Sequence, residues 1–170
     1  MKERSKRFHM TMDISLMFLL IFFDQFTKWL AVKHLKDKPA FILIDKVFVL
    51  SYLENRGAAF GMFQNKQIFF IAISTVFILA VVFVLYKMPV TRKYIYGECV
   101  LVVLLSGAVG NMIDRVINRY VVDFFYFELI DFPVFNVADI YVTLSAAALF
   151  ILILFVYKDE DLDFLKRNRE

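Results

Sequence analysis

The sequence contains few of the side chains that bind metals or form cross-links. Its 170 residues include one cysteine and two histidines. With Cys99 alone, no disulfide can form within the chain. The helix motif H-E-x-x-H of zinc proteases is missing. Because the sequence also offers no cluster of metal ligands, we expect no metal site.

Apolar side chains, in contrast, are abundant. They make up 61% of the chain, whose mean hydropathy is +0.65, whereas soluble domains contain roughly 45–50% apolar residues. A protein in lipid can leave apolar surface uncovered. The net charge of +3 is too small to indicate a protein that binds nucleic acid. The composition therefore predicts an integral membrane protein.

Four apolar runs are long enough to cross a bilayer, which takes about 20 residues. The third run is the weakest because its uncharged stretch ends at Ile113, so a three-span protein with a re-entrant third segment is the alternative. We expect an all-α membrane protein with a single domain, residues 1–170. Its four transmembrane helices are expected at about 14–32, 67–87, 98–117 and 135–157.

Lysine and arginine predict the orientation, since they accumulate in cytoplasmic loops. The bias is modest but agrees with a basic N-terminal cluster on the inside, so we expect both termini in the cytoplasm. A basic cluster before an apolar run is also typical of a secretory signal. Here Asp24 and Lys28 interrupt the run, which favours an uncleaved first span. The cluster consists of Lys2, Arg4, Lys6 and Arg7.

The segment between the first two expected spans is rich in β-forming residues. Two short runs, Phe41–Ile44 and Val47–Leu53, flank a possible turn at Asp45-Lys46. Further along, Gly57 opens a stretch of small side chains, where the backbone can come close to a ligand or a helix. We therefore expect a small extracytoplasmic β-rich segment at about 41–63, lying on the membrane.

Charged residues inside the first and third runs need a partner or a function, because a charge in lipid is costly. Asp24 and Lys28 are four residues apart and can pair on one helix face. Such a pair either fixes helix packing or helps to hold an active site. On the third run, four residues share one face, which favours a structural or substrate-positioning role: Gly107, Asn111, Asp114 and Arg115.

Two more carboxylates are expected at the same membrane level. Asp123 lies in an apolar run after the third span, and Asp139 lies in the first turn of the fourth, where Asn136 is a candidate N-cap. Taken singly, Asp123 could be a loop residue facing water and Asp139 a carboxylate favoured by the helix dipole. Held close together, the two would share one proton. One ionised and one neutral carboxyl group are the requirement of an aspartic peptidase.

Other catalytic chemistries are disfavoured. A serine–histidine or cysteine–histidine pair would have to use His34, while Cys99 is expected at the opposite membrane face. A serine–lysine pair would depend on Ser51, the single serine of the outer segments. A transporter is disfavoured because few polar residues lie along the second and fourth runs. A structural subunit is a further alternative, and it would tolerate Asp139→Asn.

Five blocks of the sequence resemble bacterial lipoprotein signal peptidase, also called signal peptidase II. They occur in the order and spacing of that family and extend from the first span to the last. Ser106 departs from the family, which often has glycine there. The blocks are Asp24-Gln25-Phe26-Thr27-Lys28, Asn55-Arg56-Gly57-Ala58-Ala59-Phe60, Gly107-Ala108-Val109-Gly110-Asn111-Met112-Ile113-Asp114-Arg115, Val122-Asp123-Phe124 and Phe135-Asn136-Val137-Ala138-Asp139.

The resemblance implies an aspartic endopeptidase of the bacterial cytoplasmic membrane that needs no metal or other cofactor. Its expected partners are membrane lipid and diacylglyceryl-modified prolipoproteins, which it would cleave before the lipidated cysteine; a monomer is the default. Asp123 and Asp139 match the catalytic pair. The positions that match supporting or substrate-binding residues are Asp24, Lys28, Asn55, Gly57, Asn111, Asp114, Arg115, Asn136 and Ala138.

Overall fold

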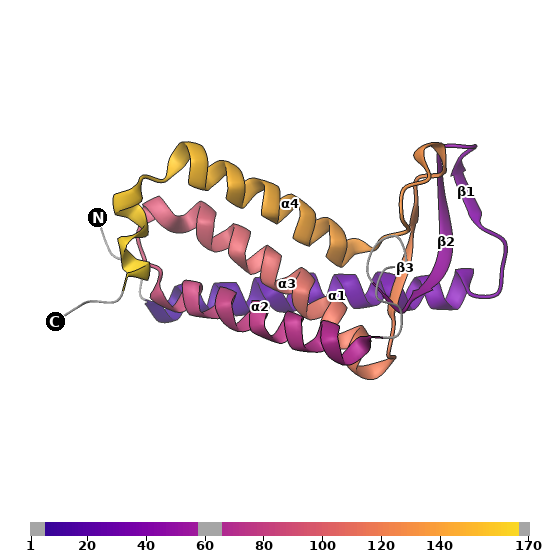
Figure 1. Cartoon of the computed structure of the whole chain (residues 1–170), viewed down its shortest axis with the longest axis horizontal. Helices are drawn as coiled ribbons and strands as arrows, with labels where there is room; N and C mark the ends of the chain where they lie inside the picture. Colours follow the sequence, from indigo (N-terminus) through magenta and orange to yellow (C-terminus); the bar gives the residue numbers. More distant parts are fainter. Residues whose placement is uncertain (1–5, 58–65, 167–170) are drawn as a thin grey trace.

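The structure is a computed structural model that describes residues 6–57 and 66–166. Within them, long helices form a bundle and a small sheet closes one end of it (Figure 1). The helices are α1 (Lys6–Leu35), α2 (Gln67–Lys87), α3 (Ile95–Ile117) and α4 (Val137–Ile151), and the strands are β1 (Phe41–Ile44), β2 (Phe48–Asn55) and β3 (Val121–Tyr126). Shorter helical segments are η2 (Arg92–Tyr94), η3 (Glu128–Ile130), η4 (Leu152–Val156) and η5 (Asp159–Leu165).

Four helices of the described chain are long and apolar enough to cross a membrane. The expected all-α membrane fold is therefore confirmed, and α3 runs as one continuous helix rather than re-entering. The second span has the expected ends, whereas the first is longer at both ends and the third begins earlier. The spans are Phe8–Leu35, Gln67–Lys87, Arg92–Ile117 and Val137–Val156.

Helix α3 is the centre of the bundle and packs against the other three helices. In the most apolar 18-residue stretch of this span, 44% is buried inside the protein. The corresponding share is 17% for the first span and 6% for each of the other two. The polar and small residues of α3 therefore contact protein instead of lipid. This burial explains why the uncharged stretch of the third run is short: a helix surrounded by protein needs little lipid-facing surface.

The sheet is antiparallel with β2 in the middle, in the order β1-β2-β3. The expected hairpin is present, and its turn places Lys46 in a left-handed conformation, with φ of 56°. Strand β3 was not foreseen, and Asp123 lies in this strand instead of a loop facing water. Four successive β3 residues are buried, so the strand lacks the alternation that reveals a strand in sequence. Residues 58–63 of the expected β-rich segment lie outside the described residues.

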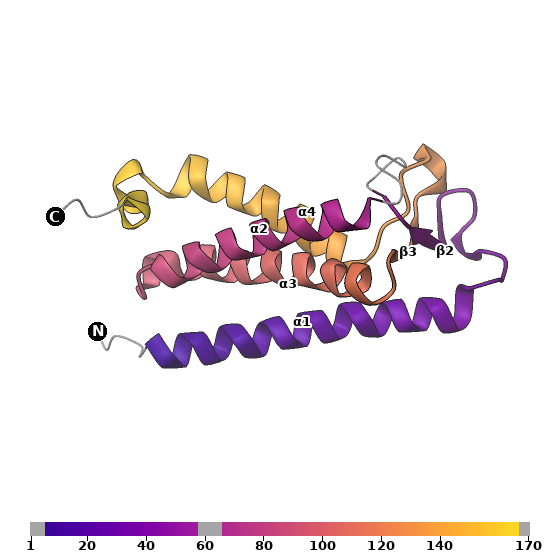
Figure 2. The same ribbon diagram turned by 60° about the horizontal axis from the view of Figure 1, so that its bottom comes forward.

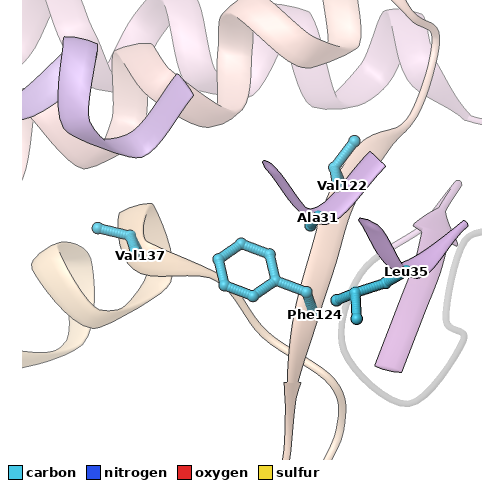
Figure 3. Packing of buried hydrophobic residues seen from close by; sticks show 5 residues of the cluster. All are labelled: Ala31, Leu35, Val122, Phe124 and Val137. Carbon is cyan, nitrogen blue, oxygen red and sulfur yellow. The ribbon is translucent and has the colours of Figure 1, made fainter. Parts of the chain in front are cut away.

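The two faces of the sheet have different surroundings. Leu53 pairs with Asp123, and since alternate residues point to opposite faces, Asn55 shares their face. On the other face, Phe124 packs in a cluster with residues of α1 and the start of α4. Figure 3 shows the Phe124 ring between Leu35 of α1 and Val137 of α4. This core fixes the strand, with Asp123 on the face opposite Phe124.

The end of the bundle opposite the sheet is closed by short polar contacts. The η5 segment contacts the residues just before α3. Lys93 forms an ion pair with Asp161, and the Tyr94 hydroxyl donates to the Asp161 carbonyl oxygen at 2.9 Å. The first described residues of α1 and the last ones of η5 lie at this same end (Figures 1 and 2). The two ends of the described chain are therefore on one side of the bundle.

Candidate active site

A cavity of about 470 Å³ opens where the sheet meets the bundle. One part of its lining is polar and includes Asp123 and Asp139 together with Asn55, Gly57 and Arg115. The rest of the lining is apolar, so the cavity suits a ligand with a polar backbone and apolar groups. The apolar residues are Phe132, Pro133, Val134, Phe135, Ile140 and Leu144; Thr143 completes the lining.

Asp123 is held in place by two amide side chains. It is 1% exposed, and its oxygen atoms accept hydrogen bonds from Asn55 Nδ2 at 2.8 Å and Asn136 Nδ2 at 2.6 Å. Asn55 is itself oriented by the Gly57 backbone N–H, which donates to its Oδ1 at 3.0 Å. The carboxyl group therefore has a fixed position, although it lies on a strand rather than a helix.

Asp139 occupies the first turn of α4 and takes part in a capping box. Asn136 Oδ1 accepts from the Asp139 backbone N–H at 3.0 Å, and Asp139 Oδ2 accepts from the Asn136 backbone N–H at 3.1 Å. The other carboxylate oxygen accepts from Asn111 Nδ2 at 2.8 Å. The start of the helix thus determines where this carboxylate points.

Asn136 connects the two carboxylates, because its side chain donates to Asp123 and caps the helix that carries Asp139. Their proximity also affects ionisation. Burial, first, and then the negative charge of Asp139 raise the pKa of Asp123 to about 7, from an ordinary aspartate value near 3.8. Asp123 can therefore hold a proton at neutral pH.

Beneath the two aspartates lies a buried cluster centred on Lys28, which is 2% exposed. Its ammonium group contacts Asp24 Oδ2 at 2.8 Å, Asn111 Oδ1 at 2.9 Å and Asp114 Oδ2 at 3.0 Å. An ammonium group has three N–H donors, so each has a partner. The Asp24–Lys28 pair expected on α1 is therefore present, but it is part of a wider network with α3.

Asp24 connects the first span with the last. It is fully buried, and its Oδ1 accepts a hydrogen bond from the Ala138 backbone N–H at 2.9 Å. That N–H lies in the first turn of α4, where backbone donors lack partners within the helix. Gly110 makes the approach possible, since a Cβ atom there would lie 2.5 Å from Asp24 Oδ2.

Asp114 and Arg115, neighbours on α3, face different surroundings. Asp114 Oδ2 accepts from the Val122 backbone N–H at 3.3 Å and so connects α3 with β3. The Arg115 guanidinium lies 5.0 Å from the Phe70 ring centre and lines the cavity. Among residues 6–57 and 66–166, its buried Nε has no hydrogen-bond partner. Arg115 is therefore less restrained than Asp114, and its guanidinium has donors available for a ligand.

All eleven residues singled out in the sequence lie in the network or in the lining of the cavity. One participant was not singled out. Gln25 Nε2 donates to Asp24 Oδ2 at 3.1 Å and to the Gly110 carbonyl oxygen at 3.1 Å. Its position next to Asp24 in an apolar run was the available signal, because a polar side chain there is costly without partners. Ser106 is fully buried and donates to the Val102 carbonyl oxygen at 2.7 Å.

The chain is similar to known proteins over most of its length. The family model of signal peptidase (SPase) II matches residues 16–155. The lipoprotein signal peptidase of Caldanaerobacter subterraneus is 45% identical over 145 residues, covering 85% of this chain and 97% of the relative. That of Clostridium tetani is 42% identical over 152 residues, covering 88% and 94%.

Solved structures include a similar fold. The structure of a bacterial membrane enzyme superimposes with a TM-score of 0.74 at 28% identity, and 94% of each chain is covered. Family match, sequence identity and fold thus extend over nearly the same residues, from the first span to the last. This chain is a multi-pass membrane protein that belongs to the signal peptidase II family, whose members remove signal peptides from prolipoproteins.

Proposed function

We propose that the chain is an aspartic endopeptidase in which Asp123 and Asp139 are the catalytic residues. Its substrates are prolipoproteins that carry diacylglycerol, and the bond cleaved is the one before the lipidated cysteine. The single observation that carries the proposal is the cavity in which two carboxylates, connected through Asn136, lie next to an apolar wall. Family membership supports the substrate, and the carboxylate geometry supports the mechanism.

The reaction follows from unequal protonation of the two groups. Ionised Asp139 takes a proton from a water molecule, whose oxygen attacks the scissile carbonyl carbon. Protonated Asp123 stabilises the developing oxyanion by hydrogen bonding. When the C–N bond breaks, Asp123 gives its proton to the leaving amine. The products are a free carboxyl group and a new amino terminus, and the proton now on Asp139 returns to the shared pair.

The supporting residues hold Asp123 and Asp139 in position. Asn55 and Asn136 orient Asp123, while Asn111 orients Asp139. Lys28 and Asp24 act at a distance by holding α1, α3 and the start of α4 together. Arg115, which lines the cavity, is suited to a carbonyl oxygen of the substrate. Gly57 lines the cavity beside Asn55.

The substrate would reach the cavity sideways from the membrane, so that its acyl chains stay in lipid. The apolar wall formed by Phe132, Ile140 and Leu144 suits this route. In the expected orientation both termini are cytoplasmic, and the sheet and the two aspartates are at the outer membrane face. A monomer contains every residue that the proposal uses.

Cleavage of a diacylglyceryl-modified prolipoprotein by the purified protein tests the proposal. We expect Asp123→Asn and Asp139→Asn each to abolish release of the signal peptide while the protein elutes and melts as the parent does. Asp45→Asn is the matched control, because Asp45 is exposed in the hairpin turn and should retain full activity. Cleavage that persists in either active-site variant would remove that residue from the catalytic pair.

A further inference from the structure

A second cavity, of about 630 Å³, lies on the other face of the sheet from the aspartates. Its lining comes from the end of α1, the chain that follows, and strands β1–β3. Phe124 belongs to this lining, whereas Asp123, the residue before it, lines the first cavity. Since successive strand residues point to opposite faces, the cavities are separated by the strand. The second cavity is therefore not part of the peptidase site.

The floor of this cavity is apolar and its rim is basic. Leu30, Ala31 and Leu35 of α1 face Leu50 and Phe124 of the sheet. At the rim lie His34 and Lys38, both exposed, whose side chains have no hydrogen-bond or ion-pair partner in residues 6–57 and 66–166. No acidic side chain contributes to the lining. The cavity thus combines an apolar interior with donors suited to an anion.

The position of the cavity matches the headgroup level of a bilayer. The first span ends at Leu35, and His34 and Lys38 lie at and just beyond that end. Trp29, which is 52% exposed, lies five residues before His34, and tryptophan is typical of the membrane–water interface. A ligand with its acyl chain in the cavity would therefore have its headgroup next to the two basic side chains.

We propose that this cavity binds one anionic phospholipid, with an acyl chain between α1 and the sheet and the phosphate between His34 and Lys38. The basic rim favours a phospholipid over a neutral diacylglyceryl group, which has no charge to offer. The volume lies within the range of roughly 300–1,000 Å³ that is usual for small-ligand sites. A bound lipid would pack against the face of β3 opposite Asp123 and so support the strand.

Lipid binding can be measured without reference to peptidase activity, so this proposal and the proposed function fail separately. The purified full chain in neutral detergent is titrated with short-chain phosphatidylglycerol or phosphatidylcholine, and native mass spectrometry counts the lipids bound. We expect one tightly bound phosphatidylglycerol. Lys38→Ala should weaken its binding about fivefold, the usual effect of one lysine on anionic lipid. His34→Ala removes a hydrogen-bond donor to the phosphate and should weaken binding as well.

Lys33→Ala is the matched control. Lys33 carries the same charge on the same helix end, but it lies over the Trp29 ring, 4.8 Å from its centre, and outside the cavity. The Lys33→Ala protein should bind the lipid as tightly as the parent does. Ala40→Trp narrows the cavity without changing charge and should weaken binding as well. Equal binding of both lipids, equal effects of Lys33→Ala and Lys38→Ala, or unchanged binding in Ala40→Trp would each overturn the proposal.

Discussion

Asn136 combines two tasks that are normally given to separate residues. Its side-chain oxygen caps α4, and its side-chain nitrogen donates to Asp123. Both tasks are possible because an amide has an acceptor and a donor on the same planar group. A shorter capping residue without the amide N–H group can therefore separate helix capping from the orientation of Asp123.

Replacing Asn136 by serine or by alanine tests this separation. Serine still caps a helix, whereas alanine at an N-cap costs about 1 kcal/mol. We expect kcat to fall in both variants, by about tenfold or more, because the hydrogen bond to Asp123 is lost. The melting temperature should fall mainly in Asn136→Ala. If Asn136→Ser retained parental kcat, the bond to Asp123 would have no part in catalysis.

The protonation of Asp123 gives a second prediction at this scale. Burial and the charge of Asp139 raise its pKa to about 7, and the proposed reaction needs its protonated form. Activity should therefore be lost as pH rises through about 7, since the proton is then released. A profile of kcat from pH 5 to 9 measures this loss. Activity that stays constant up to pH 9 would show that Asp123 does not supply a proton.

At the scale of the elements, the close approach of α3 to its neighbours depends on two glycines. A Cβ atom at Gly107 would lie 2.6 Å from the Ala138 carbonyl oxygen, and one at Gly110 would lie 2.5 Å from Asp24 Oδ2. These contacts are with backbone or with a fully buried side chain, which cannot move aside cheaply. The glycines thus set the distance between α3, α1 and α4.

We expect Gly110→Ala to lower activity by tenfold or more and to destabilise the protein by about 1–3 kcal/mol, because the added methyl group overpacks a filled site. Gly97→Ala is the comparison variant. Its Cβ atom would meet the Tyr157 hydroxyl at 2.6 Å, but this is the far end of a side chain at the other end of the bundle. It should retain activity. If the two variants lost activity and thermal stability equally, the effect of Gly110→Ala would not come from overpacking beside Asp24.

The elements differ in how far the sequence predicts them. The four spans follow from the length of apolar runs, and the hairpin follows from its two β-rich runs. Strand β3 does not, because it is buried on both faces and pairs with β2, which lies 66 or more residues earlier in the chain. Neither its hydrogen bonds nor its neighbours leave a local pattern. Its membership of the sheet depends on tertiary contacts.

The contacts within the site also differ in how far the sequence predicts them. Asp24 and Lys28 could be paired from their spacing alone. The third contact of Lys28, with Asp114, and the contact of Asp24 with the Ala138 N–H join residues from different helices. No spacing rule predicts such contacts, and Gln25 was missed for this reason. The carboxylates could be chosen by residue type, but their partners required the structure.

For the molecule as a whole, the orientation in the membrane can be tested directly. In a Cys99→Ala background, one cysteine is placed at Asp45, in the hairpin, or at Lys158, near η5. The two positions lie at opposite ends of the bundle (Figure 1). We expect a membrane-impermeant thiol reagent to label only the Asp45→Cys protein on intact cells. Labelling of Lys158→Cys alone would reverse the orientation.

The contact between Asp24 and Ala138 joins groups that are 114 residues apart in the sequence. Synthesis of the chain therefore passes through stages in which three helices are already in the membrane but Asp139 and the cap beneath it do not yet exist. Such a nascent chain carries Asp123 without its counterpart and, in the proposed mechanism, could not hydrolyse a peptide bond. Proteolytic competence would then appear only when the final helix is inserted, so a ribosome-bound or truncated chain would be latent.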